Sequence, residues 1–136
     1  MKKIVSSGLV AGLVMLIAGM IVSFVLEKLF PSLAGQYVNA NLFRPWSEPL
    51  MQLYWLVPFL NGLVLAYVWH KTKSLFPADR RQAAWWLGLV YACFALPGLV
   101  MSYSTFPVSL LMVSSWLVSS FVQAMLGAMV LTKMNK

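Results

Sequence analysis

Residues 4–26 read IVSSGLVAGLVMLIAGMIVSFVL and contain no charged side chain. A helix of this length spans a hydrocarbon core of about 30 Å, since each helical residue adds about 1.5 Å. Lys2 and Lys3 precede the run, as basic residues precede the apolar part of a secretory signal, but that part is typically only about 7–15 residues long. The stretch therefore predicts a first transmembrane helix.

The composition of the whole chain indicates that its solvent is lipid. Of its 136 residues, 61% are apolar and 10% are charged, whereas a soluble domain is about 45–50% apolar. Three further apolar stretches, residues 50–69, 83–101 and 107–131, are bounded by polar residues, prolines or charges. We predict an all-α integral membrane protein with a single domain over residues 1–136. It should form a four-transmembrane-helix bundle with antiparallel up-down neighbours and an outer loop over residues 28–48.

The lysines and arginines set the expected orientation, because basic residues in short loops stay on the cytoplasmic side. With four spans, the two termini and the loop between the second and third spans share one side. Eight of the ten basic residues lie there: Lys2, Lys3, Lys71, Lys73, Arg80, Arg81, Lys133 and Lys136. Only Lys28 and Arg44 lie on the other side. We therefore expect both termini in the cytoplasm.

The net charge of +7 is interpreted in the same way. Basic residues at membrane edges fit topology and anionic lipid headgroups better than nucleic acid. The short spans flanked by Lys and Arg, and the absence of N-x-S/T glycosylation signals, suggest the inner membrane of a bacterium.

The stretch FRPWSEPLM, residues 43–51, lies where the outer loop enters the second span. Trp46 suits the headgroup layer, and Arg44 can reach lipid phosphates. Ser47, followed by an acid and a proline, is typical of a helix start with the serine as N-cap. We interpret the stretch as an interfacial anchor and helix cap. The alternative is an external ligand or partner site that includes Arg44, Trp46 and Glu48.

Small and polar residues follow one face of three spans. In lipid there is little hydrophobic drive between helices, so packing depends on small residues that let backbones approach and on polar cross-links. The residues expected at helix contacts are Gly8, Gly12, Gly19 and Ser23 on the first span, Ala84, Gly88 and Ala92 on the third, and Ser115, Ser119, Gln123 and Gly127 on the fourth. These faces predict a tight bundle, formed within one chain or between protomers.

Polar residues and prolines at membrane depth predict a candidate pocket. Asn61 lies near the middle of the second span, on the same face as Tyr54 and Pro58. Pro58 cannot donate a backbone hydrogen bond and should leave the Tyr54 carbonyl free, as Pro97 should for Cys93. Spans two and three would then splay around an outward-facing pocket. Its expected lining residues are Glu27, Tyr54, Asn61, Ser115 and Ser119. The alternative is that these polar groups only hydrogen-bond across helices.

Residues that carry catalysis or bind metals are sparse. The three acids, Glu27, Glu48 and Asp79, fall at membrane edges, so no carboxylate lies at mid-span to carry protons. His70, the single histidine, is interpreted as a polar helix-end residue, and Cys93, the single cysteine, as a packing residue. We therefore expect no catalytic residue, no metal and no cofactor.

Three functions are considered. We first expect an accessory or scaffold subunit that packs through its small-residue faces, as a homo-oligomer or in a membrane complex. Second is a small-molecule or lipid binding or transport protein that uses the outward-facing pocket. Third is a membrane enzyme. The four-span plan resembles small multidrug transporters in general shape. Those look to be built around a membrane-embedded glutamate in the first span, whereas Glu27 lies at the helix end.

Overall fold

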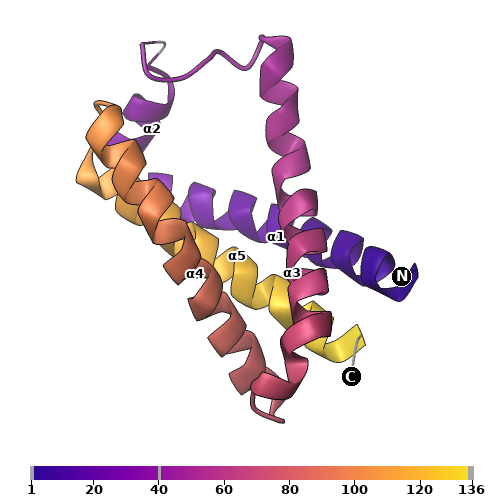
Figure 1. The fold of residues 1–136 in the computed structure, drawn as a ribbon. Coiled ribbons are helices and arrows are strands. Elements are labelled where there is room, and N and C mark those ends of the chain that lie inside the picture. Colours follow the sequence, from indigo (N-terminus) through magenta and orange to yellow (C-terminus); the bar gives the residue numbers. More distant parts are fainter. Residues whose placement is uncertain (1, 40, 135–136) are drawn as a thin grey trace.

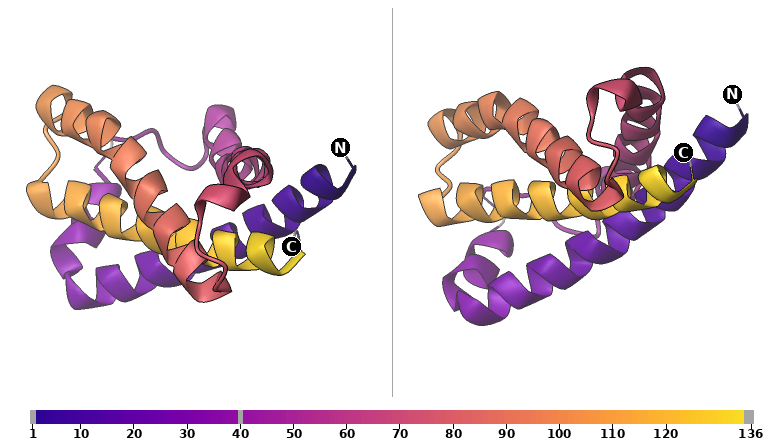
Figure 2. Two further views of the ribbon diagram at one scale, coloured as in Figure 1. Left: turned by 60° about the horizontal axis from the view of Figure 1, so that its bottom comes forward. Right: turned by 90° about the horizontal axis from the view of Figure 1, so that it is seen from below.

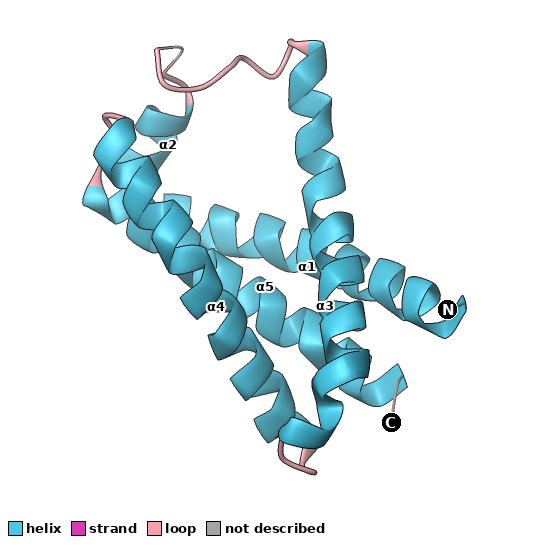
Figure 3. Ribbon diagram, in the orientation of Figure 1, coloured by secondary structure: helices cyan, strands magenta, loops and turns pink. Residues whose placement is uncertain are grey.

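The computed structural model describes residues 2–39 and 41–134, and every regular element within them is a helix (Figure 3). Four helical segments are long and apolar enough to cross a membrane: Lys2–Leu29, Pro49–Leu75, Arg80–Thr105 and Leu110–Met134. The predicted all-α fold with four membrane-length helices is therefore confirmed. Lys136, one of the basic residues counted above, lies outside the described residues.

Three of these segments are continuous α-helices, and the second is composite. The continuous helices are α1 (Lys2–Leu29), α4 (Arg80–Thr105) and α5 (Leu110–Met134). The composite segment begins as the 3-10 helix η1 (Pro49–Leu56), continues as α3 (Val57–Thr72) and ends in the short 3-10 helix η2 (Lys73–Leu75). Pro58 falls in the first turn of α3, where the N–H that proline lacks has no intrahelical partner to lose.

The backbone around Pro58 differs from the prediction. The Val57 amide donates to the Tyr54 carbonyl, so the expectation that this carbonyl lacks a partner is wrong. The tighter 3-10 turn supplies a donor one residue before the proline. The start of η1 also differs, because its N-cap is Glu48 rather than Ser47 and no side chain caps it. The Glu48 carboxylate instead accepts a charge-assisted hydrogen bond from Arg44.

The loop predicted over residues 28–48 contains a helix that the sequence pattern did not predict. This helix, α2 (Pro31–Tyr37), begins with a proline at its N-terminus. Leu33 is almost completely buried and packs in a cluster with Val108, Met112 and Val113, around the start of α5. The outer loop is therefore folded onto the helices rather than extended into solvent.

α1 and α3 cross at a contact between glycines (Figure 1). Gly8 and Gly12 of α1 face Gly62 of α3, and a Cβ added to Gly62 would collide with the backbone of both. A Cβ added to Gly12 would lie 2.7 Å from the Phe59 Cα. Backbones come this close only where side chains are absent. The small-residue face of α1 is thus used within the chain, against a glycine that was not singled out in the sequence.

α5 lies between α1 and α4 and packs against both (Figure 2). On the α1 side, a Cβ added to Gly127 would lie 2.9 Å from the Met15 Cγ. A Cβ added to Gly19 of α1 would lie 3.0 Å from the Gln123 carboxamide of α5. On the other side, Gly88 of α4 packs against the backbone of α5. The small residues therefore let α5 approach two neighbours at once.

Other residues expected at helix contacts differ in burial. Ala84 and Ala92 are buried on α4, and Ser23 is half-buried on α1. Cys93 is exposed, so its interpretation as a packing residue is wrong. Adjacent helical residues point in different directions, so the position after buried Ala92 turns away from α5.

α3 and α4 meet at one end and diverge toward the other (Figure 1). At the meeting point, Leu65 and Trp69 of α3 join Ala83 and Leu87 of α4 and Leu131 of α5 in one buried cluster. Beyond this cluster, the two helices separate toward the side that carries α2 and η1.

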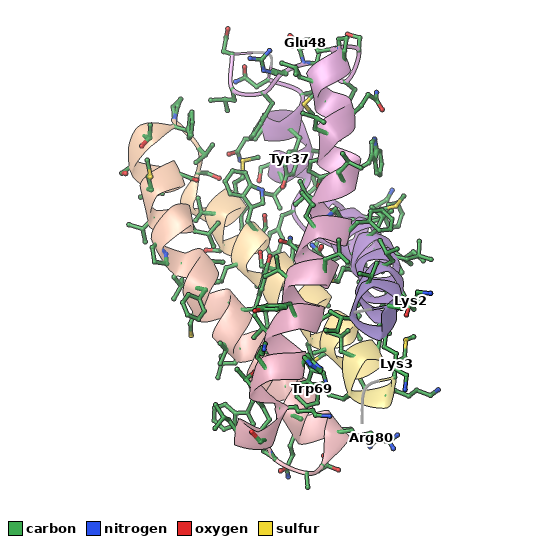
Figure 4. The ribbon with its side chains drawn as sticks, turned by 45° about the vertical axis from the view of Figure 1, so that its right-hand side comes forward. Lys2, Lys3, Tyr37, Glu48, Trp69 and Arg80 are labelled. Carbon is green, nitrogen blue, oxygen red and sulfur yellow. The ribbon has the colours of Figure 1, made fainter. Side chains whose placement is uncertain are left out.

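The two chain ends lie on one side of the molecule in both views of Figure 2. In Figure 1 the α3–α4 connection lies at the bottom, and α2, the start of η1 and the α4–α5 connection lie toward the top. Figure 4 labels Lys2, Lys3, Trp69 and Arg80 toward the first end and Tyr37 and Glu48 toward the second.

Candidate functional site

A cavity of about 260 Å³ lies where all four long segments meet. We call it the central cavity. It is lined by Met15 of α1, Tyr54 of η1, Val57, Pro58 and Asn61 of α3, Tyr91 of α4, and Ser120 and Gln123 of α5. Its polar lining consists of three hydroxyl groups and two carboxamides, all uncharged. A neutral polar ligand fits this set, because an ion would be desolvated here without a counter-charge.

Asn61 and Tyr91 bridge the two diverging helices. Their side chains lie within interaction range of each other, although α3 and α4 have little contact away from the buried cluster around Trp69. A carboxamide carries two donor hydrogens and an oxygen with two lone pairs. An interaction with Tyr91 therefore still leaves Asn61 with hydrogen-bonding capacity for a ligand in the cavity.

Gln123 forms the wall of the central cavity between α1 and α5. Its Nε2 donates to the Ser119 Oγ at 2.8 Å. Gly19 of α1 packs against the same carboxamide. A side chain at position 19 would crowd this carboxamide. Gln123 is therefore held between two helices and still borders the cavity. It combines the helix contact expected from the sequence with a lining position that was not expected.

The structure brings together only part of the predicted pocket. Tyr54 and Asn61 line the central cavity, whereas Glu27, Ser115 and Ser119 do not. The Ser115 hydroxyl donates to the Met112 carbonyl of its own helix at 2.6 Å. Ser119 lies one step behind the wall, as the acceptor for Gln123. Glu27 belongs to the last turn of α1 and contributes nothing to the lining.

Tyr91 and Ser120 line the cavity but were not singled out in the sequence. A signal for Tyr91 was present: it is a polar-tipped residue at mid-span, three positions after Gly88 on the contact face of α4. Ser120 had a weaker signal, because it follows Ser119 and only one of two adjacent serines can face a given point. Choosing between them requires the rotation of α5.

The polar side chains that line the central cavity remain accessible to a ligand or to water. Among residues 2–39 and 41–134, no buried side-chain nitrogen or oxygen lacks a hydrogen-bond partner. Unsatisfied polar groups are costly in hydrocarbon, where no water replaces the missing partner. A cavity lined by amides and hydroxyls at this depth therefore favours occupation by a polar group or by water.

The candidate external site adjoins the rim of this cavity. Arg44 and Glu48 form an ion pair of 2.6 Å, with side chains 60% and 39% exposed. Trp46 packs edge-on against Tyr54, with ring centroids 5.5 Å apart, and also contacts Trp55. Since Tyr54 lines the cavity, these aromatic rings connect the loop to the edge of the cavity. The arrangement places the loop beside the cavity.

The part of the chain that the structure describes contains no candidate metal site. No group of three or more His, Cys, Asp or Glu side chains there is placed to hold an ion. Comparisons with protein-family models, with curated protein sequences and with solved structures find no match to this chain.

Proposed function

We propose that the protein binds a small neutral polar molecule, or the uncharged polar part of a lipid, in the central cavity. The observation that carries this proposal is the convergence of Tyr54, Asn61, Tyr91, Ser120 and Gln123 on one cavity at membrane depth. Intramembrane polar side chains are rare because they are costly, and a set from three different spans is typical of a binding site.

The size of the cavity narrows the class of ligand. Pockets for drug-sized molecules are usually about 300–1,000 Å³, and the central cavity is about 260 Å³. It therefore suits a molecule smaller than a typical drug, or a hydroxyl, ester or amide group of a lipid whose chains remain in the bilayer. Asn61 and Gln123 would orient such a group, because each offers both donors and an acceptor.

The proposal includes the orientation in the membrane. Lys2, Lys3 and Arg80 lie toward one end of the molecule, and Glu48 lies toward the other (Figure 4). Basic residues favour the cytoplasmic side, which supports cytoplasmic termini in an up-down bundle of four spans. The rim at Tyr54 would then face the outer leaflet of an inner membrane.

Native mass spectrometry of the protein, released from a mild detergent, tests the binding function. Wild type should carry a copurifying neutral molecule of discrete mass, and Asn61→Leu and Tyr91→Phe should lose most of it. Ser115→Ala is the matched control, because it removes a buried hydroxyl that bonds only within α5. The binding proposal is wrong if no discrete ligand is found, or if Asn61→Leu retains it as well as the control does.

A second function, an accessory subunit, is favoured by the surface of η1. This eight-residue 3-10 helix contains no buried residue, and 3-10 runs longer than about four residues are uncommon without support. A transmembrane helix of another subunit, or of a second copy, would supply that support. No observation within the described residues favours the membrane enzyme over these two functions.

Photocrosslinking distinguishes the accessory subunit from the binding protein. A crosslinkable amino acid at Leu53 of η1 should give one discrete protein adduct in membranes. The same amino acid at Val64 of α3 is the control, because both side chains are more than half exposed and belong to the same span. Adducts only to lipid at both positions would argue against a partner on η1.

A further inference from the structure

A second cavity lies at the end of the molecule where α3 turns into α4, away from the central cavity. Its volume is about 530 Å³. We call it the basal cavity. Its walls come from the end of α3, from η2 and the following loop, from the first turn of α4 and from the end of α5. It shares no lining residue with the central cavity.

The floor of the basal cavity is apolar and belongs to the buried core. Trp69 and Ala83 line it and belong to the main buried cluster, with exposed fractions of 6% and 1%. The Trp69 ring packs against Phe76, which also lines the cavity, with centroids 5.7 Å apart. The cavity is thus built partly on the buried core of the fold and partly on the loop that connects η2 to α4.

The rim of the basal cavity is basic. Lys73 and Arg80 line it, and Ser74 adds a hydroxyl group. Arg80 is also the first residue of α4, where backbone N–H groups lack intrahelical acceptors and the helix dipole is positive. The acid beside it, Asp79, already accepts a hydrogen bond from the Gln82 amide at 2.9 Å.

The surrounding segment keeps this positive potential. Residues 70–81 contain four basic residues, Lys71, Lys73, Arg80 and Arg81, and one acid, Asp79, which leaves a net charge of +3 with histidine neutral. Lys2 and Lys3 lie toward the same end (Figure 4). An anion that approaches this end is therefore attracted before it reaches the cavity.

We propose that the basal cavity binds the phosphodiester headgroup of an acidic phospholipid. The ligand must pair an anion with an apolar part, because the rim offers two cationic side chains and the floor offers Trp69, Phe76 and Ala83. Arg and Lys bind phosphate oxygens through charge-assisted hydrogen bonds. Basic pockets between transmembrane helices at the cytoplasmic interface suit such headgroups. The proposal does not depend on what the central cavity binds.

Native mass spectrometry with added lipids tests the site. Wild type in neutral detergent should bind phosphatidylglycerol more tightly than phosphatidylcholine with the same acyl chains. In the double variant K73Q/R80Q, the ratio of the affinities for the two lipids should fall about tenfold. The matched control is K71Q/R81Q, which removes the same charge from the same segment but from residues that do not line the cavity, and it should reduce the preference much less than K73Q/R80Q does. Equal losses in both double variants would show general attraction to a basic end and would overturn the site.

A charge-neutral variant separates insertion into the cavity from attraction at a distance. Ala78→Trp places a large side chain on an exposed loop position that lines the cavity, and it should abolish the preference while keeping every basic residue. An unchanged preference, with a wild-type melting temperature, would overturn insertion into the cavity. Competition with millimolar inorganic phosphate is the last test. If phosphate binds alone and displaces the lipid, the ligand is soluble phosphate and the lipid assignment is wrong.

Discussion

The indole N–H of Trp116 donates to the hydroxyl of Tyr37 at 2.8 Å, across 79 residues of sequence. Phe43 packs near both rings, with centroids 5.8 Å from Tyr37 and 6.3 Å from Trp116. One residue earlier on α2, the Gln36 side chain accepts from the amide of Ser109, just before α5. These contacts attach the outer loop to the fourth span and explain why α2 is held against the membrane helices.

Replacing Trp116 by phenylalanine should loosen α2 without unfolding the four spans. The ring volume is largely kept, but the hydrogen bond to Tyr37 is lost, at a cost of about 1 kcal/mol. Hydrogen exchange measured by mass spectrometry should show faster exchange in residues 31–37 and unchanged exchange in α5. Trp46→Phe is the control, because Trp46 is exposed. Equal exchange of residues 31–37 in both variants would count against this role of the bond.

Gly62→Ala should destabilise the protein strongly. Its Cβ would meet the backbone of Gly8 and Gly12, which cannot move without separating α1 from α3; overpacking of this kind typically costs about 1–3 kcal/mol. Gly98→Ala is the matched control in another span, since no atom lies within 4 Å of its added Cβ. That change should be neutral or stabilising, because alanine favours helix by up to about 1 kcal/mol. Thermal unfolding in detergent measures both, and a similar midpoint for the two variants would contradict the glycine contact.

Breaking the Arg44–Glu48 ion pair should change stability little. Both side chains are well exposed, and such pairs contribute about 0–1 kcal/mol. Glu48→Gln should therefore unfold within a few degrees of wild type, as judged by thermal unfolding in detergent. If it also abolishes ligand binding to the central cavity, the loop is a recognition element; unchanged binding supports the interfacial anchor.

Cysteine labelling in intact cells should report opposite sides for two exposed positions. In a Cys93→Ser background, Val38→Cys should react with a membrane-impermeant maleimide, whereas Leu75→Cys should react only after the membrane is opened. Both side chains are about four-fifths exposed, so accessibility within the fold does not bias the comparison. Labelling of Leu75→Cys in intact cells would reverse the proposed orientation.

The candidate site shows which lining residues can be predicted from a sequence of this kind and which cannot. Asn61 and Tyr54 could be selected because polar groups at membrane depth are rare. Ser115 and Ser119 were selected over Ser120, and Tyr91 was overlooked, because the side of a span that faces lipid is as apolar as the side that faces another helix. Apolar periodicity therefore does not report the rotation of a span. Small residues mark contact faces, but they do not name the partner: Gly62 was needed to pair the face of α1 with α3.

The sequence by itself determined the solvent of this protein, the number of membrane-length helices and the distribution of its charges. These follow from composition and from the length of the apolar runs, because hydrocarbon excludes charge and requires each backbone to satisfy its own hydrogen bonds. Only the tertiary structure decided that α3 and α4 diverge, that α2 folds back onto α5 through Trp116, and which polar groups share a cavity. These features depend on how closely two backbones can approach at a few glycines and on the rotation of each helix about its axis. Both are set by contacts between residues far apart in the chain.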